Sequence, residues 1–438
     1  MGNTYNYWKN AWQKEKATLL TNPLVALIAL VLITIPLHYR YSNISIMLLV
    51  AYSLVKFKPR NFTFQKALVL PILLYGLMAL SLFWSIDFKE SLHALSKEIA
   101  FILLPLCFLI NPLLSKAEKD KILCYFSYAY FGYAIFYLLK AVIRYTITKD
   151  TSVFFYHELV TFDVNAIHMS VYISVAFFYF FIKKEKNLLD KIAIVVLLFF
   201  LVLLSSKNII IVFLILLLLA SFFHLKTKWN STNKISLLFL AILVFGFVFY
   251  GKLKDRFLLE VNSNTTENTN SQAPGLVNNV SVSDAWNKEP FQTNDFFAGT
   301  ALRVYQARIF SEMLHEEPIF YTGFGLNATQ SKIVAKRKQH QLYEGYDKFN
   351  FHNQYIQFFA EIGVFGLLLF LLIVAINLKN AIKSKNFVAI SFAILMISLF
   401  LTESFLSRQR GIVFFVIMYC IFNSKYKAFP QPKEQNLQ

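Results

Sequence analysis

Three basic or titratable residues occupy predicted starts of helices on one face of the protein: Lys207, Arg303 and His352. Free backbone N–H groups and the helix dipole favour anions at helix N-termini, so a cation there opposes the dipole. Three such cations on one face indicate that an anion is the missing partner. A lipid-linked pyrophosphate fits, because Arg grips phosphate with a bidentate fork and Lys acts as a point charge.

Each of these residues also has an interpretation without chemistry. Lys207 follows Ser205 and Ser206 at the head of an apolar segment, where a lysine can snorkel to the membrane interface. Arg303 can belong to the solvated face of a surface helix. His352 can cap its helix or join an interfacial polar patch.

Further ionisable residues lie inside or beside apolar segments, where they usually need a partner because insertion costs roughly 2–3 kcal/mol. For Glu361 we prefer a packing role, since roughly 900° of helix rotation separates it from the histidine that starts its segment. Glu403 lies near an outer helix end, with Arg408 and Arg410 as candidate partners. His168 is the other intramembrane candidate.

The composition explains why such residues stand out. The chain has 438 residues, of which 57% are hydrophobic and 16% charged, whereas soluble domains carry about 25% charged residues. The net charge of +18 forms no basic domain, which argues against nucleic-acid binding. Cys107, Cys124 and Cys420 fall in apolar segments and have neither disulfide nor metal spacing. We therefore expect an all-α integral membrane protein.

The apolar segments predict about 12 transmembrane helices, because roughly 20 apolar residues cross the hydrocarbon core. The predicted spans lie near 23–39, 43–56, 67–84, 98–114, 122–143, 165–182, 190–205, 208–223, 234–251, 354–378, 386–402 and 410–424.

Lys and Arg gather in alternate short loops, for example at 58–66 and 379–385, and this side is predicted to be cytoplasmic. Both termini then lie inside. Residues 1–22 show no short apolar core with a cleavage site, so we expect no removable signal peptide.

This topology divides the chain into an N-terminal transmembrane region (1–251, about nine helices), an outer loop (252–353) and a C-terminal region (354–438, about three helices with a short cytoplasmic tail). Within the loop, 262–294 is rich in Asn, Ser and Thr and is expected to be a mobile insertion. Residues 300–314 follow helical spacing, which predicts an amphipathic helix lying on the membrane surface.

Several motifs together resemble one family. The stretch F-H-N-Q-Y-I-Q-F-F-A-E-I-G-V-F-G at 351–366 is similar to the H-N-x-[YF]-[LI]…E-x-G-x-x-G signature of O-antigen ligases and O-antigen polymerases. Residues 301–325 resemble the family's Arg followed by a P…G-x-G turn. S-S-K at 205–207 lies where family members often carry Ser-Arg, and S-L-F-W-S-I-D at 81–87 is similar to the family's early outer loop.

The resemblance implies a GT-C-type glycosyltransferase fold in the inner membrane, with one large periplasmic loop containing short helices. It implies inverting transfer of a glycan from undecaprenyl pyrophosphate to an acceptor hydroxyl, on lipid A–core for a ligase, without cofactor or metal. Arg303 would bind the pyrophosphate with help from Lys207, and His352 would be the general base. Asn353 and Tyr355 of the motif would support them.

Two alternatives remain open. A polymerase of the same family would use another glycan repeat as the acceptor; we favour the ligase because Arg303 and His352 fall in one late loop. A transporter of the lipid-linked glycan belongs to a different class. Transporters tend to have broken helices and inverted repeats, and we find no internal repeat here.

Overall fold

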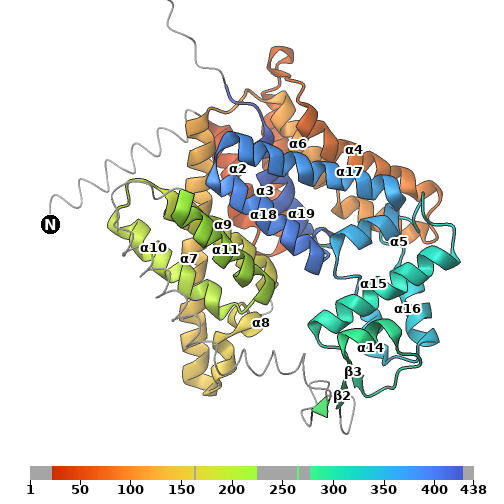
Figure 1. Ribbon diagram of the computed structural model, residues 1–438. Helices are drawn as coiled ribbons and strands as arrows, with labels where there is room; N and C mark the ends of the chain where they lie inside the picture. Colours follow the sequence, from red (N-terminus) through yellow and green to blue (C-terminus); the bar gives the residue numbers. More distant parts are fainter. Residues whose placement is uncertain (1–21, 162–163, 224–263, 266–276, 428–438) are drawn as a thin grey trace, which may run out of the picture.

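The computed structural model describes residues 22–161, 164–223, 264–265 and 277–427 (Figure 1). In this part of the chain nearly all regular structure is helical, which confirms the all-α class. The membrane-region helices are α2 (Pro23–Thr34), α3 (Tyr39–Val55), α4 (Lys66–Leu80), α5 (Phe88–Lys97), α6 (Ala100–Ile110), α7 (Lys116–Thr148), α8 (Tyr156–Leu159), α9 (Ala166–Ile182), α10 (Leu188–Leu203), α11 (Lys207–Phe223), α17 (Gln354–Ser384), α18 (Phe387–Thr402) and α19 (Gln409–Asn423). Short 3₁₀ turns η1 (Pro59–Asn61), η2 (Ser81–Phe83), η3 (Thr151–Phe154) and η5 (Phe405–Ser407) join them.

Four helical stretches of the described residues are long and apolar enough to cross a membrane: Lys66–Phe83, Phe88–Ile110, Lys116–Thr148 and Gln354–Ser384. Shorter apolar helices accompany them, among them α9, α18 and α19. The protein is therefore a multi-pass membrane protein. Every predicted span coincides with a helix except 234–251, which lies outside the described residues. Residues 1–21, predicted to lie on the inner side, are also outside the described part.

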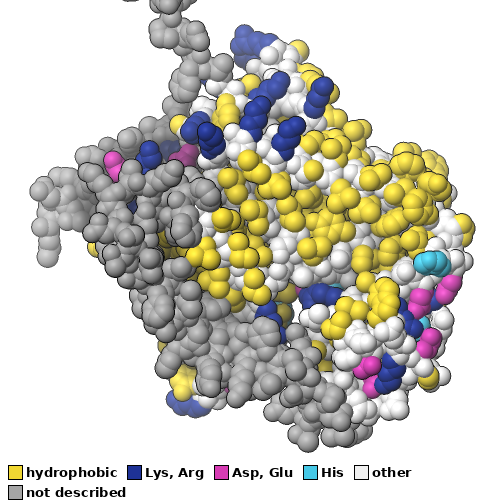
Figure 2. Space-filling view, viewed as in Figure 1, with side chains coloured by type: hydrophobic (Ala, Val, Ile, Leu, Met, Phe, Trp, Pro, Cys, Tyr) yellow, Lys and Arg dark blue, Asp and Glu magenta, His cyan; other side chains and the backbone are white. Residues whose placement is uncertain are grey.

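The surface agrees with this assignment. Figure 2 shows an apolar band across the visible face of the helical bundle, with Lys and Arg gathered at its upper edge and charges of both signs below it. Large apolar side chains are exposed on the membrane-region helices and turns, including Val55 at 80% and Phe83 at 87%. Such exposure is expected where lipid, and not water, is the solvent.

Two helices, α9 and α19, form the centre of the bundle. Both are apolar on all sides, and nearly every residue from 168 to 181 and from 411 to 421 is buried. A helix that is apolar all round buries itself among other helices. α9 packs against α7, α10 and α18, while α19 packs against α4, α6 and α17. Because they contact most of the other helices, α9 and α19 determine where those helices end on the side of the outer loop.

The outer loop forms a second body below the bundle (Figure 1). Its elements are β1 (Asn264–Thr265), β2 (Val277–Asn279), α14 (Val282–Asn287), β3 (Asp295–Phe296), α15 (Gly299–Glu316), α16 (Gln330–Gln339) and η4 (Glu344–Lys348). β2 pairs antiparallel with β1 and parallel with β3. The prediction of a mobile insertion at 262–294 differs from the structure at 277–294, because this part is ordered and buries Phe291. Residues 262–263 and 266–276 lie outside the described part of the chain.

The predicted membrane-surface helix is α15, and its environment differs from the prediction. Ala301, Tyr305, Ile309 and Met313 form its apolar face and are buried in the core of the outer loop, with Phe291. The apolar stripe was therefore the signature of a protein core and not of a lipid surface. The helix starts one residue earlier than Thr300, after Ala298, which provides no side-chain cap.

The outer loop is attached to the bundle through a turn at residues 319–326. Gly323 and Gly363 both have positive φ, of 67° and 69°, and a Cβ on either would clash with backbone of the opposite segment. The N–H of Phe324 donates to Ala360 O at 2.8 Å, and that of Gly325 to Glu361 O at 2.9 Å. Gly363 also breaks α17 into two helices. The turn is thus bonded to the break in α17.

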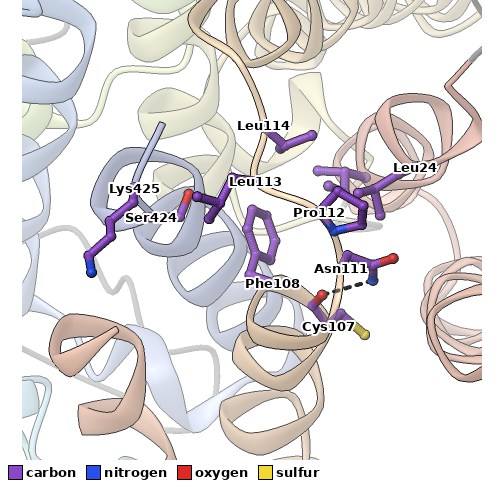
Figure 3. A pocket seen from close by; sticks show the side chains of 10 residues that line it. Leu24, Cys107, Phe108, Asn111, Pro112, Leu113, Leu114, Ser424 and Lys425 are labelled. Atoms are coloured by element: carbon purple, nitrogen blue, oxygen red, sulfur yellow. Dashed lines mark hydrogen bonds between the residues drawn. The ribbon is translucent and has the colours of Figure 1, made fainter. Parts of the chain in front are cut away.

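At the opposite end of the bundle, α2, the end of α6 and the end of α19 meet around a small pocket (Figure 3). The pocket measures about 10 Å³, which is room for about one water molecule. Asn111 lies in its wall and donates to Cys107 O at 2.8 Å. This end carries none of the predicted site residues.

Candidate functional site

Arg303 and His352 meet at one carboxylate, that of Glu403. Arg303 Nη2 lies 2.9 Å from Glu403 Oε1, and His352 Nδ1 lies 3.2 Å from Glu403 Oε2. The three residues come from α15, from the residue before the α17 cap, and from the end of α18. Glu403 is 100 residues from Arg303 and 51 from His352, so only the fold brings them together.

Arg303 is held by three contacts in a fixed orientation. Besides Glu403, its Nε donates to Thr402 O at 2.7 Å and its Nη1 to Gly299 O at 2.7 Å. A guanidinium has five N–H donors. Counted over the described residues, these contacts use three of them, so two N–H groups are left for a ligand.

His352 is positioned by the residues on either side of it. Phe351 is fully buried, and its N–H donates to Gln357 Oε1 at 3.3 Å. The Asn353 side chain caps α17 by accepting from the N–H groups of Tyr355 and Ile356. His352 itself has a φ of 46°, a left-handed conformation that non-glycine residues rarely adopt. Its side chain is 24% exposed, so a substrate can reach the ring.

Glu403 is ionised in this setting. Burial raises the pKa of its carboxyl, but the hydrogen bond with His352 and the charges of His352 and Arg303 together hold that pKa below its ordinary value. An ionised Glu403 accepts from His352 Nδ1–H, which leaves Nε2 as the basic nitrogen. The earlier assignment of Arg408 and Arg410 as partners of Glu403 is wrong: Arg410 Nη2 instead donates to Leu37 O at 2.8 Å.

Lys207 shares a cavity with Arg303 and Glu403. The cavity measures about 570 Å³, and Ser205, Ser206 and Thr300 also line it. Ser205 has a φ of 51° and lies in the short connection between α10 and α11, and α11 begins at Lys207. The predicted helix start is therefore confirmed. Figure 2 shows basic side chains in a hollow between the apolar band and the outer loop.

The remaining motif residues contact the site's supports. Asn353 Nδ2 also donates to Leu401 O at 3.2 Å, which ties the start of α17 to the end of α18. The Tyr355 hydroxyl donates to Ile397 O at 3.3 Å and its ring packs on Phe370 and Phe400. Both residues thus hold α17 against α18, beside the carboxylate.

Glu361 and His168 lie apart from the three residues at the carboxylate. Glu361 is buried at the break in α17 and accepts from Gln357 Nε2 at 2.6 Å. His168 is buried against Phe405, with ring centroids 4.3 Å apart, and lines a different cavity.

The segment at 81–87 supports the site in a way that sequence reasoning did not specify. Trp84 Nε1 donates to Thr322 O at 2.8 Å, and the Ile86 N–H donates to Phe324 O at 3.0 Å. Ser91 Oγ donates to Leu326 O at 2.5 Å. The early outer loop therefore holds the turn on which α15 and α17 depend. Its likeness to a family motif was the only sequence signal.

The comparisons with known proteins agree with these motifs. A family model described as O-antigen ligase matches residues 192–371, a range that holds Lys207, Arg303 and His352. No curated protein matches the chain.

Proposed function

We propose that the chain, whose residues 192–371 match a family model described as O-antigen ligase, transfers a glycan from undecaprenyl pyrophosphate to a sugar hydroxyl of lipid A–core. The reaction takes place on the periplasmic face of the inner membrane and inverts the anomeric carbon. Its site is the cavity of Lys207, Arg303 and Glu403 with His352 beside it. The observation that carries this proposal is the shared contact of Arg303 and His352 with Glu403.

In the proposed reaction the acceptor hydroxyl oxygen attacks C1 of the donor sugar. The new C1–O bond forms as the bond from C1 to the pyrophosphate oxygen breaks, and the electron pair of that bond leaves with the diphosphate. The hydroxyl proton passes to His352 Nε2. The remaining N–H donors of Arg303, together with the Lys207 ammonium, stabilise the charge that grows on the leaving oxygen.

Glu403 acts in this mechanism as a positioning residue. Its carboxylate fixes the imidazole tautomer by accepting at Nδ1 and stabilises the imidazolium that forms when Nε2 takes the proton. The same carboxylate orients the guanidinium. A carboxylate so close to a diphosphate also limits how tightly the product diphosphate is held, which favours its release.

The proposal is tested with Arg303→Ala and His352→Ala in a strain that lacks the native gene. We expect each variant to lose the glycan ladder on lipid A–core, with a decrease in transfer of about 10²–10⁴-fold for the general base. Membrane levels of the protein must match the wild type. Full transfer by either variant would remove that residue from the mechanism.

Two control variants match the test residues in type. His315 is exposed on α15, where its Nδ1 contacts Ser311 O of its own helix, and Arg60 is exposed in η1 at the other end of the bundle. We expect His315→Ala and Arg60→Ala to keep transfer near the wild-type level.

The same strain separates the ligase from the polymerase. Loss of the ladder from lipid A–core while long glycans persist on the carrier lipid supports the ligase. A single repeat left on the core supports the polymerase, whose acceptor would be another glycan repeat.

A further inference from the structure

A second cavity lies beside the candidate site, bounded by α3, α5, α6, α9 and the start of α19. It measures about 1040 Å³, and it shares no lining residue with the cavity of Lys207. The two are neighbours, because Ile167 lines the first and His168 the second. The start of α9 and the connection from α18 to α19 therefore form the wall between them.

The lining of the second cavity is basic. None of the described residues that line it is Asp or Glu. Its permanently charged side chains are Lys97, Arg408 and Arg410, and three histidines also line it. Same-sign charges gathered in a cavity with low-dielectric walls raise the local concentration of the opposite ion. The cavity therefore favours an anion.

Two of these cations differ from Arg303 in lacking a carboxylate partner. Lys97 and Arg408 are exposed, and neither forms an ion pair with a described Asp or Glu. Arginines elsewhere in the protein do form such pairs: Arg303 with Glu403 and Arg144 with Glu158. Arg410 is held in place at the cavity by its bond to Leu37 O. Mutual repulsion of these cations is relieved when an anion sits between them.

The cavity also has an apolar edge. Met47 and Ile99 line it and are 66% and 43% exposed. On the same helix as Met47, Ile44 and Leu48 are 54% and 48% exposed, as expected of a lipid-facing surface. The cavity thus joins a basic interior to a face that contacts acyl chains, which is the shape needed for an amphiphile with an anionic head group.

We propose that this cavity binds the phosphate-bearing head group of an amphiphile seated in the bilayer, separately from the carrier diphosphate. Arg408 supplies a planar fork for phosphate oxygens, and Lys97 supplies a point charge. A phosphorylated acceptor glycolipid and an anionic phospholipid share this chemistry. If the transfer proposed above is correct, an acceptor anchored here lies beside the reaction site; binding itself does not depend on that transfer.

The experiment measures equilibrium binding to the purified full-length chain in neutral detergent. The probes are bis-phosphorylated lipid A, the same lipid after dephosphorylation, and undecaprenyl pyrophosphate. The test variant is Lys97→Gln/Arg408→Gln, and its matched control is Lys89→Gln, an exposed lysine of α5 that lines neither cavity. Arg303→Gln changes the cavity of Lys207 and tests whether lipid A binds there instead.

We expect the double variant to bind bis-phosphorylated lipid A at least about 10-fold more weakly than Lys89→Gln does, and Arg303→Gln to bind it like the wild type. Dephosphorylated lipid A should bind the wild type at least about 10-fold more weakly. Competition by dioleoylphosphatidylglycerol at equal affinity would identify a bilayer phospholipid as the occupant. Absence of competition would identify the glycolipid, and both results support the phosphate site.

Three results would overturn the proposal: equal affinity of the double variant and the control for lipid A, equal affinity of the phosphorylated and dephosphorylated lipids, or weakened binding of undecaprenyl pyrophosphate alone. Arg408→Lys keeps the charge and should retain most binding, which separates loss of the site from misfolding. Failure of the transferase proposal would leave these affinities unchanged.

Discussion

At the scale of single residues, Glu403 joins two basic side chains that arrive from distant segments. The motifs were enough to single out Arg303 and His352. Sequence alone did not identify Glu403 as their common partner, because Arg408 and Arg410 are nearer to Glu403 in sequence and were its candidate partners. Contacts between residues 100 positions apart depend on how α15 and α18 pack, and no local pattern encodes that.

Arg303→Lys tests whether charge alone is sufficient at this position. The guanidinium reaches Glu403, Thr402 O and Gly299 O through three separate nitrogens, and a lysine ammonium cannot make this planar set of contacts. We expect transfer to fall by about 10²-fold, in the range found when one preorganised donor is lost. Initial rates with purified protein measure this; an unchanged rate would show that only the charge matters.

Lys207→Arg, in contrast to Arg303→Lys, should not lower the rate of transfer. An arginine at this position adds a bidentate grip on the proposed diphosphate in a cavity of about 570 Å³. We expect transfer to be retained or raised, and Lys207→Gln to lower it by about 10-fold or more. If Lys207→Gln transferred at the wild-type rate, the lysine would be an interfacial anchor and no ligand of the diphosphate.

The pH dependence of stability follows from Glu403. Its pKa is lower in the folded protein than in the unfolded chain, where the reference value is about 4.3. Its contribution is therefore complete above about pH 4.3 and is lost as the pH falls through the folded pKa. The difference in Tm between wild type and Glu403→Gln should thus be constant above about pH 4.3 and shrink as the pH falls below it. A difference that did not shrink there would contradict an ionised, paired Glu403.

At the scale of elements, the break in α17 and the turn at 319–326 form one structural unit. The apolar run from 354 onward predicted a continuous helix, because hydropathy does not report a change of backbone direction. Gly363 was visible only as part of a motif. Its role emerges from the turn, since the Val364 N–H donates to Phe320 O at 2.9 Å. The helix breaks where the outer loop docks.

Gly363→Ala tests this unit. An alanine there would need a φ of 69° and would place its Cβ 2.1 Å from Tyr321 O, so we expect a loss of about 1–3 kcal/mol or more and a lower Tm. Gly76→Ala is the matched control, because nothing lies within 4 Å of a Cβ at Gly76 inside α4. Gly76→Ala should be neutral or slightly stabilising. Equal Tm values for the two variants would contradict the docking role.

The environment of α15 shows what the spacing of apolar residues cannot predict, namely whether protein or lipid covers an apolar face. An apolar stripe with the spacing of Ala301, Tyr305 and Ile309 predicts a buried face, and that face is indeed buried. Whether lipid or protein covers it depends on residues such as Phe291 and Phe297, which lie in a region whose polar composition resembled a solvated insertion. The short strands were missed for the same reason, since two or three residues carry no period.

At the scale of the whole molecule, the helical bundle was the most predictable feature. Spans of apolar residues located most of the described membrane helices, because lipid imposes length and composition on every crossing segment. The helices α5 and α8 were not predicted and lie between the predicted spans. The boundaries were less accurate where polar residues extend a helix. α7 begins at Lys116 and not near 122, since Ser115 and Glu118 form a capping box ahead of the apolar run.

The predicted orientation is tested by cysteine labelling in intact cells. Lys338→Cys is exposed in the outer loop, and Lys383→Cys is exposed at the far end of α17. We expect a membrane-impermeant maleimide to label Lys338→Cys in spheroplasts and Lys383→Cys only after lysis. The parent protein gives the background, which comes from half-buried Cys124 and from Cys107 and Cys420, both buried. Labelling of both positions from outside would contradict the single crossing by α17 that is predicted between them.

The central claim is that Arg303, Glu403 and His352 act as one unit in glycan transfer. The most direct test is a double-mutant cycle on the initial rate of transfer, with purified protein, a lipid-linked glycan donor and lipid A–core. If Glu403 acts through the histidine, His352→Gln/Glu403→Gln should be no slower than His352→Gln alone by more than about 3-fold, although Glu403→Gln alone is slowed by about 10²-fold. Fully additive losses, or a His352→Gln variant that transfers at the wild-type rate, would contradict the account.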